Sequence, residues 1–387
     1  MKHLKKLSVA LMFSAALITG ASAQTQGVTD TEVVIGSNSD LSGIFAAFGA
    51  PSVKAAQMYF DEVNANGGVH GRQIKFVVED HGYSMPKSVQ TVNKLVNRDK
   101  IFAMFLQIGT PMNIASFKLL EPKGIPNVFP MTMARQLIEE PIALRFSPGA
   151  SYYDQIKVGV NYLVETKGAK NICAMFLPND FGKEIQAGAK DLAADLGLNY
   201  AGETTHKPDD ADFVGAISKL KEAGCDVVAM ALGVRQTITA YGTSKKLGWT
   251  DVSFISAAPG FHSVMAKVPG GVTEGLYASA VWADILPRMS NPVVGMWAKS
   301  YMEASGEKLP STGAVLGRSG AESMVRALEA AGKDLTAESF RSGMESLNYK
   351  DEILDAQMDF SATDHSGADE VVVSVIENGN WKEVTRK

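Results

Sequence analysis

The sequence predicts an α/β fold made of two doubly wound lobes that are joined by three crossover segments. Short β-branched runs alternate with helical patterns of about ten to fifteen residues, and the alternation starts again after Pro148-Gly149. The length of 387 residues also exceeds what one hydrophobic core usually serves. We expect an N-terminal lobe formed by residues 27–145 with 280–355 and a C-terminal lobe formed by residues 146–279 with 356–387.

The first ordered stretch is typical of a strand, an open loop, a helix and a second strand. Residues 33–35 are β-branched, and residues 37–49 are rich in small and turn-forming residues. Pro51 suits the first position of the helix, and Gly67-Gly68 provides its end. Because a helix N-terminus directs free N–H groups over such a loop, residues 41–49 are the first candidate wall of a binding site.

The same alternation predicts the remaining elements. We expect helices at 84–98, 111–120, 152–164, 182–196, 213–221 and 237–246, and strands at 101–106, 127–129, 171–177, 227–232 and 252–255. Three further helices, at 293–304, 316–331 and 337–346, should pack on the first lobe, and the C-terminal tail should form a hairpin around Asn378-Gly379. Crossings near residues 145, 279 and 355 would form a hinge that permits closure around a ligand.

Composition and targeting signals restrict the function classes. Residues 1–23 combine three lysines, an apolar run and an Ala-Ser-Ala end, which predicts a cleavable secretory signal peptide. The net charge of −5 disfavours binding to nucleic acid. Cys173 and Cys225 lie in or beside apolar runs, and an oxidising compartment would permit a disulfide between them. We nevertheless expect two buried thiols that act as small hydrophobic side chains.

The sequence lacks the motifs that usually carry catalysis or cofactor binding. It has no phosphate-binding P-loop, no nucleophile elbow, no H-E-x-x-H and no dinucleotide fingerprint after a strand. The histidines are scattered without the spacing of metal ligands. We therefore expect a protein that is not an enzyme and that uses neither a metal nor a cofactor.

Two loops at the ends of predicted strands offer polar groups for binding. Gly109 and Thr110 lie between a buried strand and a helix, where the hydroxyl and neighbouring N–H groups would hold a carboxylate, unless Thr110 is only a helix N-cap. Met131, Thr132 and Met133 follow the next strand and present one hydroxyl between two thioethers. Such a loop suits an irregular apolar ligand, unless both methionines fill the core.

Four stretches carry a family resemblance: IGSNSDLSGIFAAFG, FDEVNANGGVHGRQIKFVVED, GTPMNIASFKLLEPKGIPNVFP and LPNDFGKEIQAGAKDL. With them, the chain from residue 32 onward resembles the type I periplasmic solute-binding proteins of ABC transporters, in the branch of the leucine/isoleucine/valine-binding protein. The resemblance implies a monomeric periplasmic protein that closes two lobes on a small solute. It also implies that this protein delivers the solute to an inner-membrane permease and catalyses no reaction.

The resemblance assigns positions in the site as well. By this resemblance, Gly109 and Thr110 correspond to the family's contacts with the ligand carboxylate, and Met131, Thr132 and Met133 to its next ligand contacts. Phe48 and Phe181 correspond to two positions that usually hold tyrosine in the amino-acid binders. The amino-acid binders fix the ligand ammonium with an acidic residue, whereas this chain has uncharged residues around Ala258. A buried ammonium without a carboxylate partner is costly.

These departures indicate the class of ligand. We expect a small carboxylate with an apolar or aromatic body, such as a benzoate- or phenylpropanoid-type acid. Arg235 would be its charge partner or else a solvated surface residue, and Trp282 would stack on the ligand or else seal the hinge. His262 and Tyr83 are weaker candidates at the rim. The alternatives are a branched-chain or other hydrophobic amino acid as ligand, a ligand-sensing partner of a membrane receptor, and a secreted hydrolase, for which no nucleophile motif is present.

Overall fold

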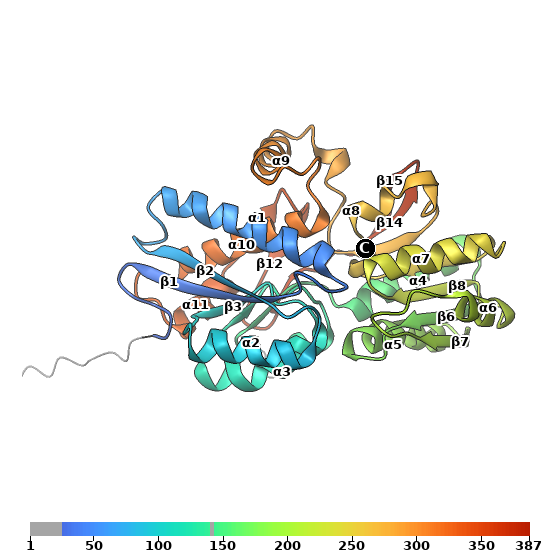
Figure 1. The fold of residues 1–387 in the computed structure, drawn as a ribbon, viewed down its shortest axis with the longest axis horizontal. Helices are drawn as coiled ribbons and strands as arrows, with labels where there is room; N and C mark the ends of the chain where they lie inside the picture. Colours follow the sequence, from blue (N-terminus) through green and yellow to red (C-terminus); the bar gives the residue numbers. More distant parts are fainter. Residues whose placement is uncertain (1–24, 140–142) are drawn as a thin grey trace, which may run out of the picture.

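The computed structural model describes residues 25–139 and 143–387, and this part of the chain has the predicted α/β architecture. Two sheets with their helices form two lobes that lie side by side (Figure 1). The predicted signal peptide lies outside the described residues. Among the described helices, none combines the length and hydrophobicity that a membrane crossing requires.

The first lobe is built on a six-stranded sheet of order β13-β5-β4-β3-β1-β2, in which every pair of neighbours is parallel. Its strands are β1 (Glu32–Ser39), β2 (Gln73–Asp80), β3 (Ala103–Phe105), β4 (Asn127–Val128), β5 (Arg145–Gly149) and β13 (Ser366–Ala368). The helices of this lobe are α1 (Ala46–Ala65), α2 (Met85–Asn97), α3 (Thr110–Leu120), α10 (Thr312–Ala331) and α11 (Ala337–Glu345).

The C-terminal helices pack on the first lobe, as the sequence predicted. Gly313 and Gly317 allow α10 to approach α1 closely, because a Cβ atom would lie 2.5 Å from the Phe48 carbonyl oxygen at the first glycine and 2.0 Å from the Ser52 carbonyl oxygen at the second. In Figure 1 the orange α10 accordingly lies against the blue α1. Helix α9 (Pro292–Ser305) precedes α10 and stands at the edge of the molecule.

The second lobe contains a seven-stranded sheet of order β15-β14-β10-β9-β8-β6-β7. Its strands are β6 (Asn171–Phe176), β7 (Asn199–Thr205), β8 (Val227–Ala231), β9 (Ser253–Ser256), β10 (Tyr277–Ala280), β14 (Val372–Glu377) and β15 (Asn380–Arg386). Its helices are α4 (Tyr152–Lys167), α5 (Asp180–Asp195), α6 (Val214–Glu222), α7 (Val234–Lys246) and the short α8 (Ser263–Ala266). Strands β14 and β15 form the predicted hairpin, and Asn378 (φ 52°) and Gly379 (φ 69°) supply the left-handed turn.

The third passage between the sheets lies later in the chain than residue 355. Strand β13 still pairs with β5 in the first sheet, and β14 is the first strand of the tail in the second sheet. The chain therefore changes sheets at residues 369–371. Between α11 and β13, the strands β11 (Asn348–Asp351) and β12 (Ala356–Asp359) form a separate two-stranded sheet.

Helix α1 begins five residues earlier than the proline predicted. The Asp40 carboxylate accepts hydrogen bonds from the backbone N–H groups of Gly43 (2.6 Å) and Phe45 (2.9 Å), which holds the turn that leads into the helix at Ala46. Pro51 consequently lies inside α1. Because proline has no N–H, the carbonyl of Ala47, one turn earlier, lacks its helical donor.

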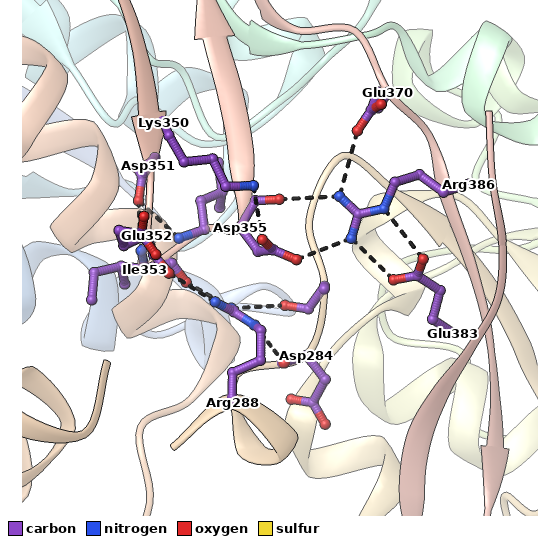
Figure 2. A network of polar contacts seen from close by, with 12 residues as sticks. Asp284, Arg288, Lys350, Asp351, Glu352, Ile353, Asp355, Glu370, Glu383 and Arg386 are labelled. Atoms are coloured by element: carbon purple, nitrogen blue, oxygen red, sulfur yellow. Dashed lines mark hydrogen bonds and ion pairs between the residues drawn. The ribbon is translucent and has the colours of Figure 1, made fainter. Parts of the chain in front are cut away.

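Two arginines connect the crossing segments at the hinge (Figure 2). Arg386 of β15 donates to both the backbone carbonyl (3.2 Å) and the carboxylate (3.0 Å) of Asp355, which follows β11. Arg288, after the second crossing, donates to the carbonyls of Glu352 and Ile353, each at 2.8 Å. Both guanidinium groups thus hold the turn between β11 and β12. Arg386 also lies 3.5 Å from the carboxylate of Glu370 in the third crossing, so this turn links the second crossing to the third.

The two cysteines are paired, contrary to the expectation of free thiols. Cys173 lies in β6 and Cys225 lies just before β8, and a disulfide joins them with 5.9 Å between their Cα atoms. Strands β6 and β8 are neighbours in the sheet, so the pairing order brings the two residues together. The spacing of the cysteines in the sequence does not reveal that order, because three elements, α5, β7 and α6, separate the two strands along the chain.

The disulfide closes a loop of 52 residues and should stabilise the second lobe. Replacement of Cys173 and Cys225 by alanine together should lower the free energy of unfolding by about 2 to 4 kcal/mol, because the unfolded chain regains the freedom that the bridge removes. Urea unfolding of the variant and of the reduced wild-type protein measures this. Equal stability of the oxidised wild type and the double variant would contradict the prediction.

Candidate functional site

A cavity lies where the carboxyl ends of the strands of both sheets meet. The space between its lining residues amounts to about 540 Å³, part of which is open to solvent. In chain order, the residues that line it after successive strands are Phe45 and Phe48 after β1, Tyr83 after β2, Ile108, Gly109 and Thr110 after β3, Phe129 to Met133 after β4, Tyr152 after β5, Phe181 after β6, Ala258 and Pro259 after β9, and Trp282 after β10. Pro148 of β5 and Leu316 of α10 complete the lining.

The loops of the first lobe reach the cavity through strained turns. Leu106, Phe129 and Tyr83 adopt left-handed backbone angles, with φ of 51°, 49° and 56°, although none is a glycine. Such conformations cost about 1 to 3 kcal/mol each and persist only where the surroundings enforce them. At Gly109 (φ 95°) a Cβ atom would lie 2.7 Å from the Met112 sulfur, so only glycine fits there. The shape of this wall is therefore fixed by the fold.

Two threonine hydroxyls form the polar centre of this wall. The Oγ1 atoms of Thr110 and Thr132 lie 2.6 Å apart and share a hydrogen bond, and both residues are buried. Gly109 occupies the N-cap position of α3, where no side chain caps the helix. The alternative that Thr110 serves as an ordinary N-cap therefore does not hold. Thr110 is instead the first residue of the helix, beside backbone N–H groups that have no carbonyl partner within the helix.

The residues that line the cavity carry no formal charge. Ala258 lies where an acidic residue would be expected in an amino-acid binder, and its backbone N–H donates to the Gln155 side chain at 2.9 Å. Burial raises the pKa of the Tyr152 phenol to about 12, so this lining residue is a neutral hydroxyl at physiological pH. The cavity therefore offers hydrogen bonds without a charged partner for either a carboxylate or an ammonium.

Aromatic rings from both lobes meet at one end of the cavity. Phe45 of the first lobe packs against Tyr83, with ring centroids 4.9 Å apart, and edge-on against Phe181 of the second lobe at 5.6 Å. Phe181 also packs edge-on against Tyr152, again at 5.6 Å. The contact between Phe45 and Phe181 joins the two lobes, and the other two contacts extend the aromatic cluster within each lobe.

A histidine of the second lobe uses the carbonyl that Pro51 leaves without a helical donor. His262 Nδ1 accepts from the Val264 N–H at 3.1 Å, so its Nε2 carries the proton and donates to the Ala47 carbonyl at 3.1 Å. The imidazole also packs edge-on against Phe48, with 4.6 Å between ring centroids. The carbonyl that Pro51 leaves without a helical donor therefore takes part in a hydrogen bond between the lobes, directly beside Phe48, which lines the cavity.

Two further polar contacts hold the lobes together. Ser263, at the start of α8, and Thr312, at the start of α10, exchange hydrogen bonds: each hydroxyl accepts from the other residue's backbone N–H, at 3.0 and 3.3 Å. Arg135, between β4 and β5, donates to the buried Glu184 carboxylate of α5 through its backbone N–H and its Nε, each at 3.0 Å. The structure therefore describes the lobes in contact around the cavity.

Nine of the ten residues expected at the site line this cavity: Phe48, Gly109, Thr110, Met131, Thr132, Met133, Phe181, Ala258 and Trp282. Arg235 is the exception, because it lies exposed in the first turn of α7 and outside the cavity. Of the weaker rim candidates, Tyr83 lines the cavity, whereas His262 contacts its wall through Phe48.

Other lining residues were not expected from the sequence. Phe45 lies within residues 41–49, which the sequence indicated as a wall of the site, and Pro148 and Tyr152 lie at the predicted first crossing. The sequence therefore indicated both regions, although it did not single out these residues. Leu316 comes from a helix distant in sequence, and only the packing of α10 on α1 brings it to the cavity. No local pattern could have identified it.

The sequence is similar to a protein family and to named relatives. The model of a family described as periplasmic binding protein matches residues 32–380. The "Amino acid binding protein" of Pseudomonas aeruginosa is 24% identical over 223 residues, and the match spans 56% of this chain and only 59% of that protein. The "Leucine-, isoleucine-, valine-, threonine-, and alanine-binding protein" of the same organism is 22% identical, with 69% of this chain and 71% of that protein covered.

Solved structures show the same fold over nearly the whole chain. A "Fatty acid ABC transporter substrate-binding protein" from Thermomonospora curvata matches with a TM-score of 0.82 and 25% identity, covering 93% of both chains. A solute-binding protein from R. palustris in complex with benzoate matches with a TM-score of 0.81 and 16% identity, and the match covers 92% of this chain and 96% of that one. A branched chain amino acid ABC transporter protein from Thermus thermophilus with bound valine matches with a TM-score of 0.83 and 20% identity, and the match covers 92% of this chain and 95% of that one.

The contact made by His262 predicts a pH dependence of stability. Burial lowers the pKa of the imidazole from 6.5 to about 4, so between these values the unfolded chain binds a proton that the folded protein does not. The stability from the neutral ring is fully present above pH 6.5 and should be lost as the pH falls toward 4. Urea unfolding at pH 7.0, 5.5 and 4.5 should show a steeper decline for the wild type than for His262→Gln. Parallel declines in the two proteins would refute this role.

Proposed function

The chain belongs to the periplasmic binding protein family, and from this premise we propose that it captures a small carboxylic acid with an apolar or aromatic body between its lobes. The acid would be released to an inner-membrane ABC permease, and the protein would act as a monomer in the periplasm. The family consists of binding proteins, so the proposal includes no chemical reaction on the ligand. Closure of the two lobes would remove the ligand from solvent.

The observation that carries the proposal is the uncharged lining of the cavity. A carboxylate can be stabilised by hydroxyl and backbone N–H donors at a helix N-terminus, which Thr110, Thr132 and the start of α3 supply. An ammonium group needs acceptors and, when buried, a negative partner. None of the lining residues is acidic, so the charge pattern favours an acid without an amino group.

The body of the ligand would occupy the apolar part of the cavity. Phenylalanine, methionine, tryptophan and proline side chains make up most of the lining, and methionine adapts its shape to flat or irregular ligands. The similarity to a fatty acid transporter protein and to a benzoate complex supports this class of ligand, since fatty acids and benzoate are acids without an amino group.

A branched-chain or other hydrophobic amino acid is the second candidate. The specific observation that favours it is the naming of the relatives, together with the structure of similar fold that holds valine. This alternative requires the ammonium to be satisfied by neutral acceptors alone, such as the threonine hydroxyls and loop carbonyls. That arrangement is the less favourable one on electrostatic grounds.

Calorimetry separates the two candidates. Protein that has been unfolded, dialysed and refolded to remove bound ligand should bind benzoate, 3-phenylpropanoate or hexanoate, and should bind leucine and valine at least tenfold more weakly. The reason is the uncompensated ammonium of the amino acids. Tight binding of leucine without a response to any of the acids would contradict the proposed ligand class and support the second candidate.

Thr110 provides a test at the level of one residue. Thr110→Ala should weaken binding of the preferred acid by about 1 to 2 kcal/mol, which is the usual size of a hydrogen bond to a charged group. Thr110→Ser keeps the hydroxyl and is the matched control, which should retain most of the affinity. Calorimetry measures both variants. Unchanged affinity in Thr110→Ala, with lower stability alone, would assign the residue a structural role.

A further inference from the structure

We propose that the indole N–H of Trp282 is a specificity-determining donor, which selects acids that carry a second hydrogen-bond acceptor remote from the carboxylate. The acceptor would be a hydroxyl, ether or carbonyl oxygen on the body of the ligand. This inference rests on the proposed function, because it concerns the same cavity. It narrows the ligand from any apolar acid to an oxygen-substituted one.

The first observation is the state of the Trp282 side chain. Trp282 lines the cavity and is only 2% exposed, and its Nε1 atom is buried without a hydrogen-bond partner among the described residues. An indole N–H is a donor only, so it can be satisfied by an acceptor and by nothing else. Buried donors are almost always paired in folded proteins, and an unpaired one at a binding site calls for an explanation.

A second buried tryptophan, Trp381, does have a hydrogen-bond partner for its indole N–H. Trp381 is equally buried, and its Nε1 donates to the His262 carbonyl at 3.0 Å. The two indoles are linked through Phe261, which stacks on Trp381 at 4.7 Å and meets Trp282 edge-on at 6.1 Å. Of these two buried tryptophans in one cluster, only the one that lines the cavity leaves its donor unused.

The backbone that carries Trp282 is held firmly. Val281, the preceding residue, packs so closely against the first crossing that a Cβ atom at Gly149 would lie 2.9 Å from its side chain. Trp282 itself follows β10 at the second crossing. This packing holds the backbone before Trp282 in place, and the unpaired indole N–H is the donor that we assign to the ligand.

The location of Trp282 distinguishes it from the donors for the carboxylate. Thr110 and Thr132 follow strands of the first sheet, whereas Trp282 follows a strand of the second. Tyr83 also belongs to the first lobe, and its ring lies beside Gly109. A ligand held between the lobes would therefore meet the threonine hydroxyls from the first lobe and the indole from the second.

Paired acids test the inference by calorimetry. The probes are benzoate with 4-hydroxybenzoate, 3-phenylpropanoate with 3-(4-methoxyphenyl)propanoate, and hexanoate with 5-oxohexanoate. Wild-type protein should bind the oxygenated member of at least one pair about tenfold more tightly. Trp282→Phe keeps an aromatic ring but has no donor, so the ratio of the two dissociation constants within that pair should fall from about ten to about one.

Trp381→Phe is the matched control. It removes an indole donor from the same cluster but outside the cavity, so the preference for the oxygenated acid should remain even if stability falls. A second readout needs no variant: the indole ¹H–¹⁵N signal of Trp282, assigned as the one missing from the Trp282→Phe spectrum, should shift downfield with the oxygenated acid only.

The outcomes separate this inference from the proposed function. If acids bind but no pair shows a preference, or if Trp282→Phe keeps the preference, Trp282 only packs on the ligand or seals the hinge, and the inference is overturned alone. If none of the acids binds the wild-type protein, the proposed function and the inference are both overturned.

Discussion

The site depends on one constraint, the parallel order of all strands in the first sheet and of β6 to β10 in the second. Parallel strands end at the same edge, so all of the loops that follow them gather at one place in each lobe. Residues after β1, β2, β3 and β4 form one wall of the cavity, and residues after β6, β9 and β10 form the other. The cavity is therefore a property of the topology, and the side chains on the loops determine its shape and its polarity.

Contact between the lobes depends on local features of the same loops. Pro51 deprives α1 of one hydrogen bond, and His262 of the other lobe donates to the carbonyl that is left. Because His262 also packs on Phe48, which lines the cavity, the closing contact and the binding surface share one residue. The arginines that hold the turn between β11 and β12 lie away from this contact, beside the second and third crossings (Figure 2).

Much of this arrangement could be predicted from the sequence, because alternating hydrophobic runs and helix signals are local. The order of the lobes, the loops around Thr110 and Thr132, and the hairpin at Asn378 all follow from short patterns. The position of the third crossing could not be predicted from the sequence, because β13 consists of three small residues and tertiary packing decides their pairing with β5. The partnership of Cys173 with Cys225 depends on the neighbourhood of β6 and β8, and the exposure of Arg235 depends on how α7 lies on its sheet.

The central claim is that an uncharged cavity selects an acid without an amino group. It is tested most directly by mass spectrometry of the small molecule released when the protein, purified from the periplasm without added ligand, is denatured. The account predicts a carboxylic acid that appears in negative-ion mode and does not react with an amine-specific label. Stoichiometric recovery of leucine, isoleucine or valine would contradict it.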